Sequence, residues 1–136
     1  MEYLVGVGLA ALVCAFAATV GFDRERVFYP TVMAVIASYY VLFAVMGNSS
    51  RVLVLKSLMA AGFVALAVAG FKFNLWLVVA ALAAHGVFDL FHRLLVQNRG
   101  VPTWWPGFCL AFDVLAAGIL AVQLVRRSGF AARAAR

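Results

Sequence analysis

The chain has 136 residues, 67% of them hydrophobic, and a mean hydropathy of +1.06. Soluble domains are close to half apolar, so this composition excludes an ordinary soluble fold and makes lipid the solvent for most of the surface. The net charge of +6 favours anionic lipid headgroups as partners. It does not indicate nucleic-acid binding, because that function needs a soluble basic face with exposed aromatic side chains.

Five segments are long and apolar enough to cross a bilayer, which takes about 20 residues as a helix. None of them alternates with the period of two that is typical of membrane strands. We therefore predict one all-α membrane domain over residues 1–125. Its five transmembrane helices are expected at about 3–22, 27–47, 52–71, 75–96 and 105–125.

The first two spans are separated by the charged turn Asp23–Arg26. No Lys or Arg precedes the first apolar run, whereas signal peptides carry positive charge there, so this run is expected to be retained as a span. Pro30 falls in the first turn of the second span, where its missing N–H costs nothing.

The remaining spans are joined by one very short and one longer connection. Lys72–Asn74 is so short that the third and fourth spans are predicted to be antiparallel neighbours. The longer loop, Gln97–Thr103, precedes Trp104 and Trp105, which are expected to anchor the fifth span at the membrane interface. Residues 126–136 then form a basic tail.

The distribution of basic residues predicts the orientation, because cytoplasmic loops carry the excess of Lys and Arg. One side carries seven: Arg24, Arg26, Lys72, Arg126, Arg127, Arg133 and Arg136. The other side carries four: Arg51, Lys56, Arg93 and Arg99. We expect the N-terminus outside and the C-terminal tail in the cytoplasm, in a multi-pass protein of a bacterial-type inner (plasma) membrane.

Rows of small residues at a spacing of four lie on three of the spans and favour close helix packing in lipid. The rows are Gly6, Ala10, Cys14 and Ala18; Ala61, Ala65 and Ala69; and Cys109, Asp113, Ala117 and Ala121. They are expected to hold the bundle together, and such faces also suit homo- or hetero-oligomers.

Polar side chains inside the fourth and fifth spans are the main functional signal, because titratable groups are expensive in a bilayer. At 100° per residue, His85, Asp89 and His92 share one helix face. Counted from the helix ends, His85 lies about 15 Å deep and Asp113 about 12 Å deep. Asp113 is therefore expected to meet His85 and Asp89 at one level, with Cys109 one turn nearer the outside.

Our leading interpretation is a site for a small hydrophobic molecule. Burial disfavours the charged forms of His and Asp, so such a pair exchanges protons near neutral pH, as acid–base chemistry requires. His85, Asp89 and Asp113 are the candidate catalytic residues, and the molecule is expected to enter from the outer leaflet. The candidate substrate-binding residues are Tyr39, Tyr40, His92 and Cys109.

Two other interpretations remain open. In the first, the charges only neutralise each other in a structural accessory subunit, with Asp89 paired to Arg93 and Lys56 to Asp113. In the second, the chain handles protons or metal ions. No cofactor is required, but a divalent metal suits the donors His85, Asp89 and Asp113, with Cys109 as an alternative ligand. His85 and His92 lie two turns, about 10 Å, apart, which is too far for both to bind one ion.

Overall fold

The computed structural model describes residues 1–47, 49–97 and 99–134, without the side chains of 92–95, 131, 132 and 134. Within these ranges it holds helices and no strand. The long helices are α1 (Glu2–Val20), α2 (Phe28–Met46), α3 (Ser50–Lys72), α4 (Trp76–Leu95) and α5 (Trp105–Ala134), and a short 3-10 helix, η1 (Phe22–Arg24), follows α1.

Local signals explain where several helices begin and end. Gly21 ends α1 with φ of 91°, the left-handed conformation that glycine adopts without strain. Pro30 stands in the first turn of α2, as predicted. Asn74 accepts a 3.0 Å hydrogen bond from the backbone N–H of Trp76 and so caps the start of α4.

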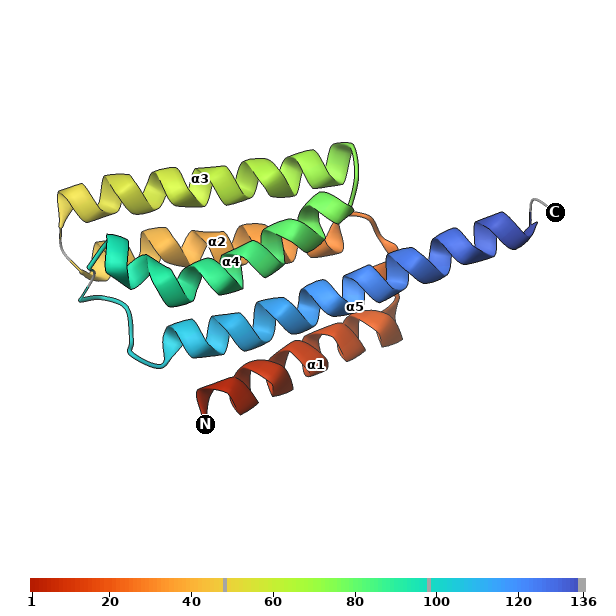
Figure 1. Cartoon of the computed structure of the whole chain (residues 1–136), viewed down its shortest axis with the longest axis horizontal. Coiled ribbons are helices and arrows are strands. Elements are labelled where there is room, and N and C mark those ends of the chain that lie inside the picture. Colours follow the sequence, from red (N-terminus) through yellow and green to blue (C-terminus); the bar gives the residue numbers. More distant parts are fainter. Residues whose placement is uncertain (48, 98, 135–136) are drawn as a thin grey trace.

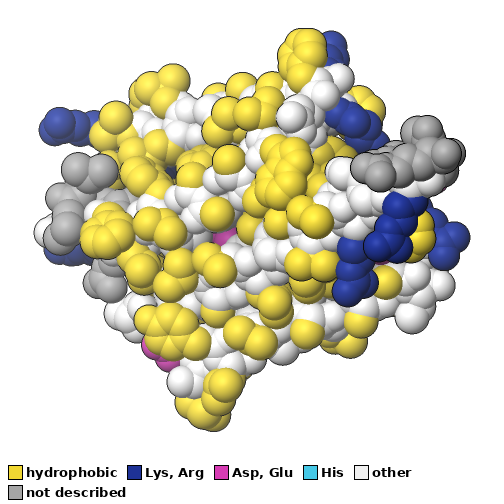
Figure 2. Space-filling model, turned by 45° about the vertical axis from the view of Figure 1, so that its right-hand side comes forward, with side chains coloured by type: hydrophobic (Ala, Val, Ile, Leu, Met, Phe, Trp, Pro, Cys, Tyr) yellow, Lys and Arg dark blue, Asp and Glu magenta, His cyan; other side chains and the backbone are white. Residues whose placement is uncertain are grey.

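Four of the helices are long and apolar enough to cross a membrane: α1, α2, α3 and the part of α5 from Trp105 to Phe130. The described apolar part of α4, Trp76–Phe91, is shorter than the length of about 20 residues that a span needs. Figure 2 shows hydrophobic side chains over the middle of one face, with lysines and arginines toward its ends. The composition and length of these helices are therefore those of a membrane protein.

The contacts between helices trace an incomplete ring, and α1 and α5, which are far apart in the sequence, lie side by side (Figure 1). α1 packs chiefly against α5, α5 against α4, α4 against α3, and α3 against α2. The antiparallel neighbours predicted across Lys72–Asn74 are confirmed as α3 and α4. α1 and α2 do not pack against each other to a comparable extent, so the ring is open between them.

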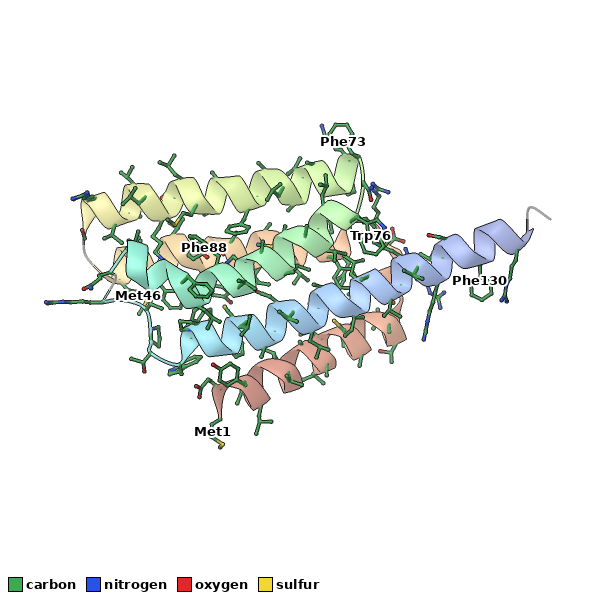
Figure 3. The ribbon with its side chains drawn as sticks, in the orientation of Figure 1. Met1, Met46, Phe73, Trp76, Phe88 and Phe130 are labelled. Atoms are coloured by element: carbon green, nitrogen blue, oxygen red, sulfur yellow. The ribbon has the colours of Figure 1, made fainter. Side chains whose placement is uncertain are left out.

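The connections lie at two opposite ends of the bundle (Figure 1). The η1 turn, the α3–α4 turn and the projecting part of α5 lie at one end, and the N-terminus with the other connections lies at the opposite end. Phe73 and Trp76 mark the first of these ends and Met46 the second (Figure 3). The loops that were predicted to share a side therefore do so.

Side chains at the first end tie the turns to the helices. Arg26 donates from Nη2 to the backbone oxygen of Gly70 at 3.2 Å, near the end of α3. The Asp23 carboxylate accepts a 3.0 Å hydrogen bond from Gln123, and its backbone oxygen accepts one of 2.9 Å from Arg127. These bonds fix η1 against α5.

The described part of the predicted basic tail, residues 126–134, is the continuation of α5. α5 continues as one helix through Ala134 and projects beyond the other helices (Figure 1). Nothing in the run from Val125 onward breaks a helix, because it contains no proline and its one glycine, Gly129, is tolerated at modest cost.

The prediction that the rows of small residues form packed helix faces is only partly confirmed. On α1, Gly6, Ala10 and Cys14 are buried, but Ala17 replaces Ala18 because a helix repeats every 3.6 residues rather than every four. A Cβ atom on Gly6 would lie 2.5 Å from the backbone oxygen of Phe108, so α1 and α5 are in very close contact there.

On α5 the row is buried at Cys109, Asp113 and Ala117 and partly exposed at Ala121. The row on α3 is wrong, because Ala61 and Ala65 are exposed. The buried small residues of this helix are Ala60, Ala67 and Gly70.

Candidate functional site

A buried hydrogen bond joins α4 to α5 at the centre of the site. His85 Nδ1 lies 2.7 Å from Asp113 Oδ2, and the two side chains are 2% and 0% exposed. This confirms the predicted meeting of His85 with Asp113. Gly86 allows the approach, since a Cβ atom there would lie 3.1 Å from both Leu110 Cα and Asp113 Cβ.

A second buried pair lies beside the first and joins α2 to α4. The hydroxyl of Tyr40 donates a 2.7 Å hydrogen bond to Asp89 Oδ1. The ring of Tyr40 also packs against His85, with 5.0 Å between the ring centroids. Tyr40 thus contacts both His85 and Asp89 of α4, which makes α2 a third wall of the site.

Lys56 of α3 is fully buried and completes this cluster. Its Nζ lies 4.6 Å from the centroid of the Tyr40 ring, a cation–π arrangement, and makes no hydrogen bond to any described residue. The expected pairing of Lys56 with Asp113 is therefore wrong, because Asp113 is bonded to His85 instead. Lys56 was not among the predicted site residues, although a lone lysine inside an apolar segment was a signal for it.

Phe63, an aromatic residue of α3, packs against both His85 and Tyr40. The rings of Phe63 and His85 meet edge to face at 4.9 Å, and Phe63 also contacts Phe88. Figure 3 shows Phe88 between α3 and α4. Sequence patterns did not indicate Phe63, because phenylalanine is common throughout this chain.

Three potential metal-binding side chains lie close together in the same region. One ligand atom each from His85, Asp89 and Cys109 lies within 4.8 Å of the other two, and all three residues are buried. Asp113, predicted as a ligand, instead holds Nδ1 of His85. The side chains of His92 and Arg93 lie outside the described residues, and so do the predictions that rest on them.

An apolar groove with a volume of about 470 Å³ lies on the neighbouring side of α5. It lies between α1 and α2, where the ring of helices is open. Its lining is formed by Leu9, Val13, Phe28, Thr31, Val32, Val35, Ile36, Tyr39, Trp105, Phe108, Cys109, Phe112 and Asp113. The groove thus reaches the predicted site residues Tyr39, Cys109 and Asp113.

A much smaller hollow, of about 10 Å³, lies between α2, α3 and α4. Lys56, His85 and Asp89 line it together with Tyr40, and it has room for about one water molecule or ion. Ile36, Tyr39 and Trp105 line both the hollow and the groove. These shared residues make the apolar groove and the polar cluster immediate neighbours.

Trp104 and Trp105, predicted together as interface anchors, lie in different surroundings. Trp104 is 49% exposed, whereas Trp105 packs edge to face on Tyr39 and Phe43 and lines the groove. Trp104 therefore lies at the surface, whereas Trp105 forms part of the wall of the groove.

Three polar atoms of the cluster are buried and have no hydrogen-bond partner among the described residues: His85 Nε2, Asp113 Oδ1 and Lys56 Nζ. Unsatisfied buried polar atoms are rare in native proteins, and they are especially costly in a lipid environment. Their grouping makes this cluster the candidate functional site of the described residues, although Asp23 Oδ1 and Gln123 Oε1 are likewise without a described partner.

We compared the chain with models of protein families, with curated proteins and with solved structures, and nothing in any of the three matches it.

Proposed function

We propose that this chain binds a small hydrophobic molecule in the groove between α1 and α2, with the polar part of the molecule at Asp113. The observation that carries this proposal is a groove of about 470 Å³ with apolar walls that reaches a buried His/Asp pair. Pockets for small molecules have volumes of about 300–1,000 Å³ and combine apolar walls with a few placed polar groups.

The position of the groove supports entry from the bilayer. Leu9 and Val35 line it from opposite sides and are 41% and 51% exposed. In a membrane their exposed surfaces would face lipid tails. A hydrophobic molecule dissolved in the bilayer would then reach the groove laterally, between α1 and α2, without crossing water.

The acid–base chemistry that we propose takes place at Asp113. Its Oδ2 is held by His85 and its Oδ1 has no described partner. A proton from a hydroxyl group of the bound molecule would pass to Oδ1. The hydrogen bond from His85 to Oδ2 keeps the carboxylate oriented for this transfer, and geometry of this kind is the first requirement for a general base.

We further propose that all five helices cross a bacterial-type inner membrane, with the N-terminus outside and the C-terminus in the cytoplasm. The ends of the bundle support this arrangement, because the η1 turn, the α3–α4 turn and the C-terminal end of α5 lie together and carry most of the basic residues.

Photolabelling tests the proposed ligand site. The probe is a long-chain fatty alcohol that carries a diazirine and an alkyne, added to membranes that contain the full chain. We expect its crosslinks on the groove-lining peptides of α2 and α5. Val35→Trp should fill the groove and remove most of this labelling. Val45→Trp is the matched control, since Val45 is on the same helix, is 59% exposed and does not line the groove.

Equal labelling of all lipid-facing helices, or an equal loss in the two variants, would rule out the groove as a binding site.

The orientation has its own test in C-terminal fusions. A green fluorescent protein fused after the last residue should fluoresce, and an alkaline phosphatase fused there should be inactive. The opposite pair of results would invert the proposed topology.

A further inference from the structure

We propose that His85, Asp89 and Cys109 bind one divalent metal ion of the zinc class, with Asp113 as the residue that positions His85. The geometry that carries this proposal is the grouping of three buried donor atoms within 4.8 Å of one another, on two helices in direct contact. Imidazole nitrogen, carboxylate oxygen and thiolate sulfur are the ligand atoms that proteins use for Zn²⁺.

His85 has the surroundings of a metal-binding histidine. Such a residue typically binds the metal through one ring nitrogen and donates the other N–H to a carboxylate, which fixes the ring and its tautomer. Here the Asp113 carboxylate is 2.7 Å from Nδ1, so Nε2 is the nitrogen that remains for a metal. Nε2 is buried and has no partner among the described residues.

The carboxylate of Asp89, the second proposed ligand, is also held by a residue that is not itself a ligand. Tyr40 donates to Asp89 Oδ1 at 2.7 Å and so restricts the rotation of this carboxylate. Metal-binding carboxylates are usually hydrogen-bonded in this way. Two of the three ligands therefore have the supporting contacts that a metal site requires before any metal binds.

The space beside two of the three donors, His85 and Asp89, has the size of an ion; Cys109 does not line it. The hollow beside His85 and Asp89 has a volume of about 10 Å³. In a tetrahedral zinc site, bonds of about 2.0–2.3 Å place neighbouring ligand atoms about 3.3–3.8 Å apart. The observed limit of 4.8 Å means that the donors would have to move closer by up to about 1.0–1.5 Å when the ion binds.

The charges of the group balance a divalent ion. An Asp89 carboxylate and a Cys109 thiolate together carry two negative charges and His85 is a neutral ligand, so the ion is offset within its own ligand set. Lys56 lines the same hollow and opposes a cation there. The proposed ion and the Lys56 ammonium group are thus both attracted to the Asp89 carboxylate and repel each other.

This site does not depend on the proposed function, because its donors stand on α4 and α5 whether or not a molecule occupies the groove. Cys109 is the residue common to both, since it also lines the groove. A bound metal would therefore border the proposed ligand site.

Cobalt titration of the full chain in detergent tests the inference. The protein is first stripped with a chelator, and Co²⁺ then serves as a spectroscopic probe for the zinc site. We expect one equivalent of Co²⁺ to give tetrahedral visible bands together with a thiolate-to-cobalt charge-transfer band. Zn²⁺ should then displace it. Absence of stoichiometric binding, or visible bands without the thiolate band, would overturn the proposal.

Three variants locate the ligands. Cys109→Ser should abolish the thiolate band, whereas Cys14→Ser, the matched control at the other buried cysteine, should keep it. Asp113→Asn should weaken Co²⁺ binding about 10–100-fold and leave the thiolate band in place, as expected for a positioning residue. Equal losses in the two cysteine variants would contradict the assignment, as would loss of the thiolate band in Asp113→Asn.

Discussion

His85 Nδ1 and Asp113 Oδ2 are 2.7 Å apart, and this bond joins α4 to α5 at a point where neither side chain has access to solvent. A buried pair of this kind is costly to break, because removal of one member leaves the other polar group without compensation. Loss of one member is therefore expected to lower stability whether or not the pair has the proposed function, so the two effects need separate tests.

The double variant His85→Leu/Asp113→Leu measures the coupling between these residues. Each single change should lower the free energy of unfolding by about 3–5 kcal/mol, because it strands the remaining partner. The double variant should cost less than either single one, because both polar groups are then gone. Unfolding of the detergent-solubilised protein in a denaturing detergent provides the measurement. Costs that simply add would show that the two side chains do not interact.

Tyr40→Phe tests the second pair. It removes the donor to Asp89 Oδ1 and should lower the free energy of unfolding by about 1–3 kcal/mol. The control is Tyr39→Phe on the same helix, since the Tyr39 side chain faces the groove and forms no described hydrogen bond. That variant should stay within about 0.5 kcal/mol of the wild type. Similar effects of the two substitutions would argue against a special role for the Tyr40 hydroxyl.

Gly86→Ala tests the close contact between α4 and α5. The new Cβ atom would lie 3.1 Å from Leu110 Cα, and backbone cannot move aside without a shift of the whole helix. We expect a loss of about 1–3 kcal/mol in the free energy of unfolding. Gly118→Ala is the control, because a Cβ atom there meets nothing within 4 Å.

The control should be neutral, or more stable by up to about 1 kcal/mol, since alanine favours helix more than glycine does. A Gly86→Ala protein as stable as Gly118→Ala would mean that the two helices are farther apart than described.

Lys56→Met tests the competition between the buried lysine and the proposed metal ion. Removal of a positive charge that lines the hollow should tighten Co²⁺ binding at least about tenfold. Lys72→Met is the matched control, because Lys72 ends α3 at an exposed position. It should leave the affinity unchanged. An affinity in Lys56→Met equal to that of the control would place the ion away from Lys56, and weaker binding would contradict the proposed competition.

Much of the fold and part of the site could be predicted from local rules. The apolar runs indicated the helices, because burial of backbone polar groups in lipid requires helical hydrogen bonding. The meeting of His85 with Asp113 followed from counting residues along α4 and α5, because the rise per residue is constant. Counting along one helix could not give the partners of Lys56 or Asp89, since these depend on how α2 and α3 are rotated about their axes.

The same limit explains the wrong row on α3. Alanine is small on every face of an apolar helix, so the sequence pattern could not tell the packed face from the lipid-facing one. Ala61 and Ala65 are exposed, whereas Ala67 and Gly70 pack against neighbouring helices. Contacts with α2 and with α4, where Gly70 meets Val78, fix the rotation of α3.

The sequence by itself determined that this is an all-helical chain with the length and apolar character of a membrane protein, and that His85 and Asp113 lie at one level. Both follow from composition and from the regular geometry of a helix. The tertiary structure alone decided that the ring stays open between α1 and α2, that the groove there reaches Asp113, and that donor atoms of Cys109, His85 and Asp89 lie close together. These features depend on which helices pack together and how each is rotated, and side-chain packing between distant segments sets both.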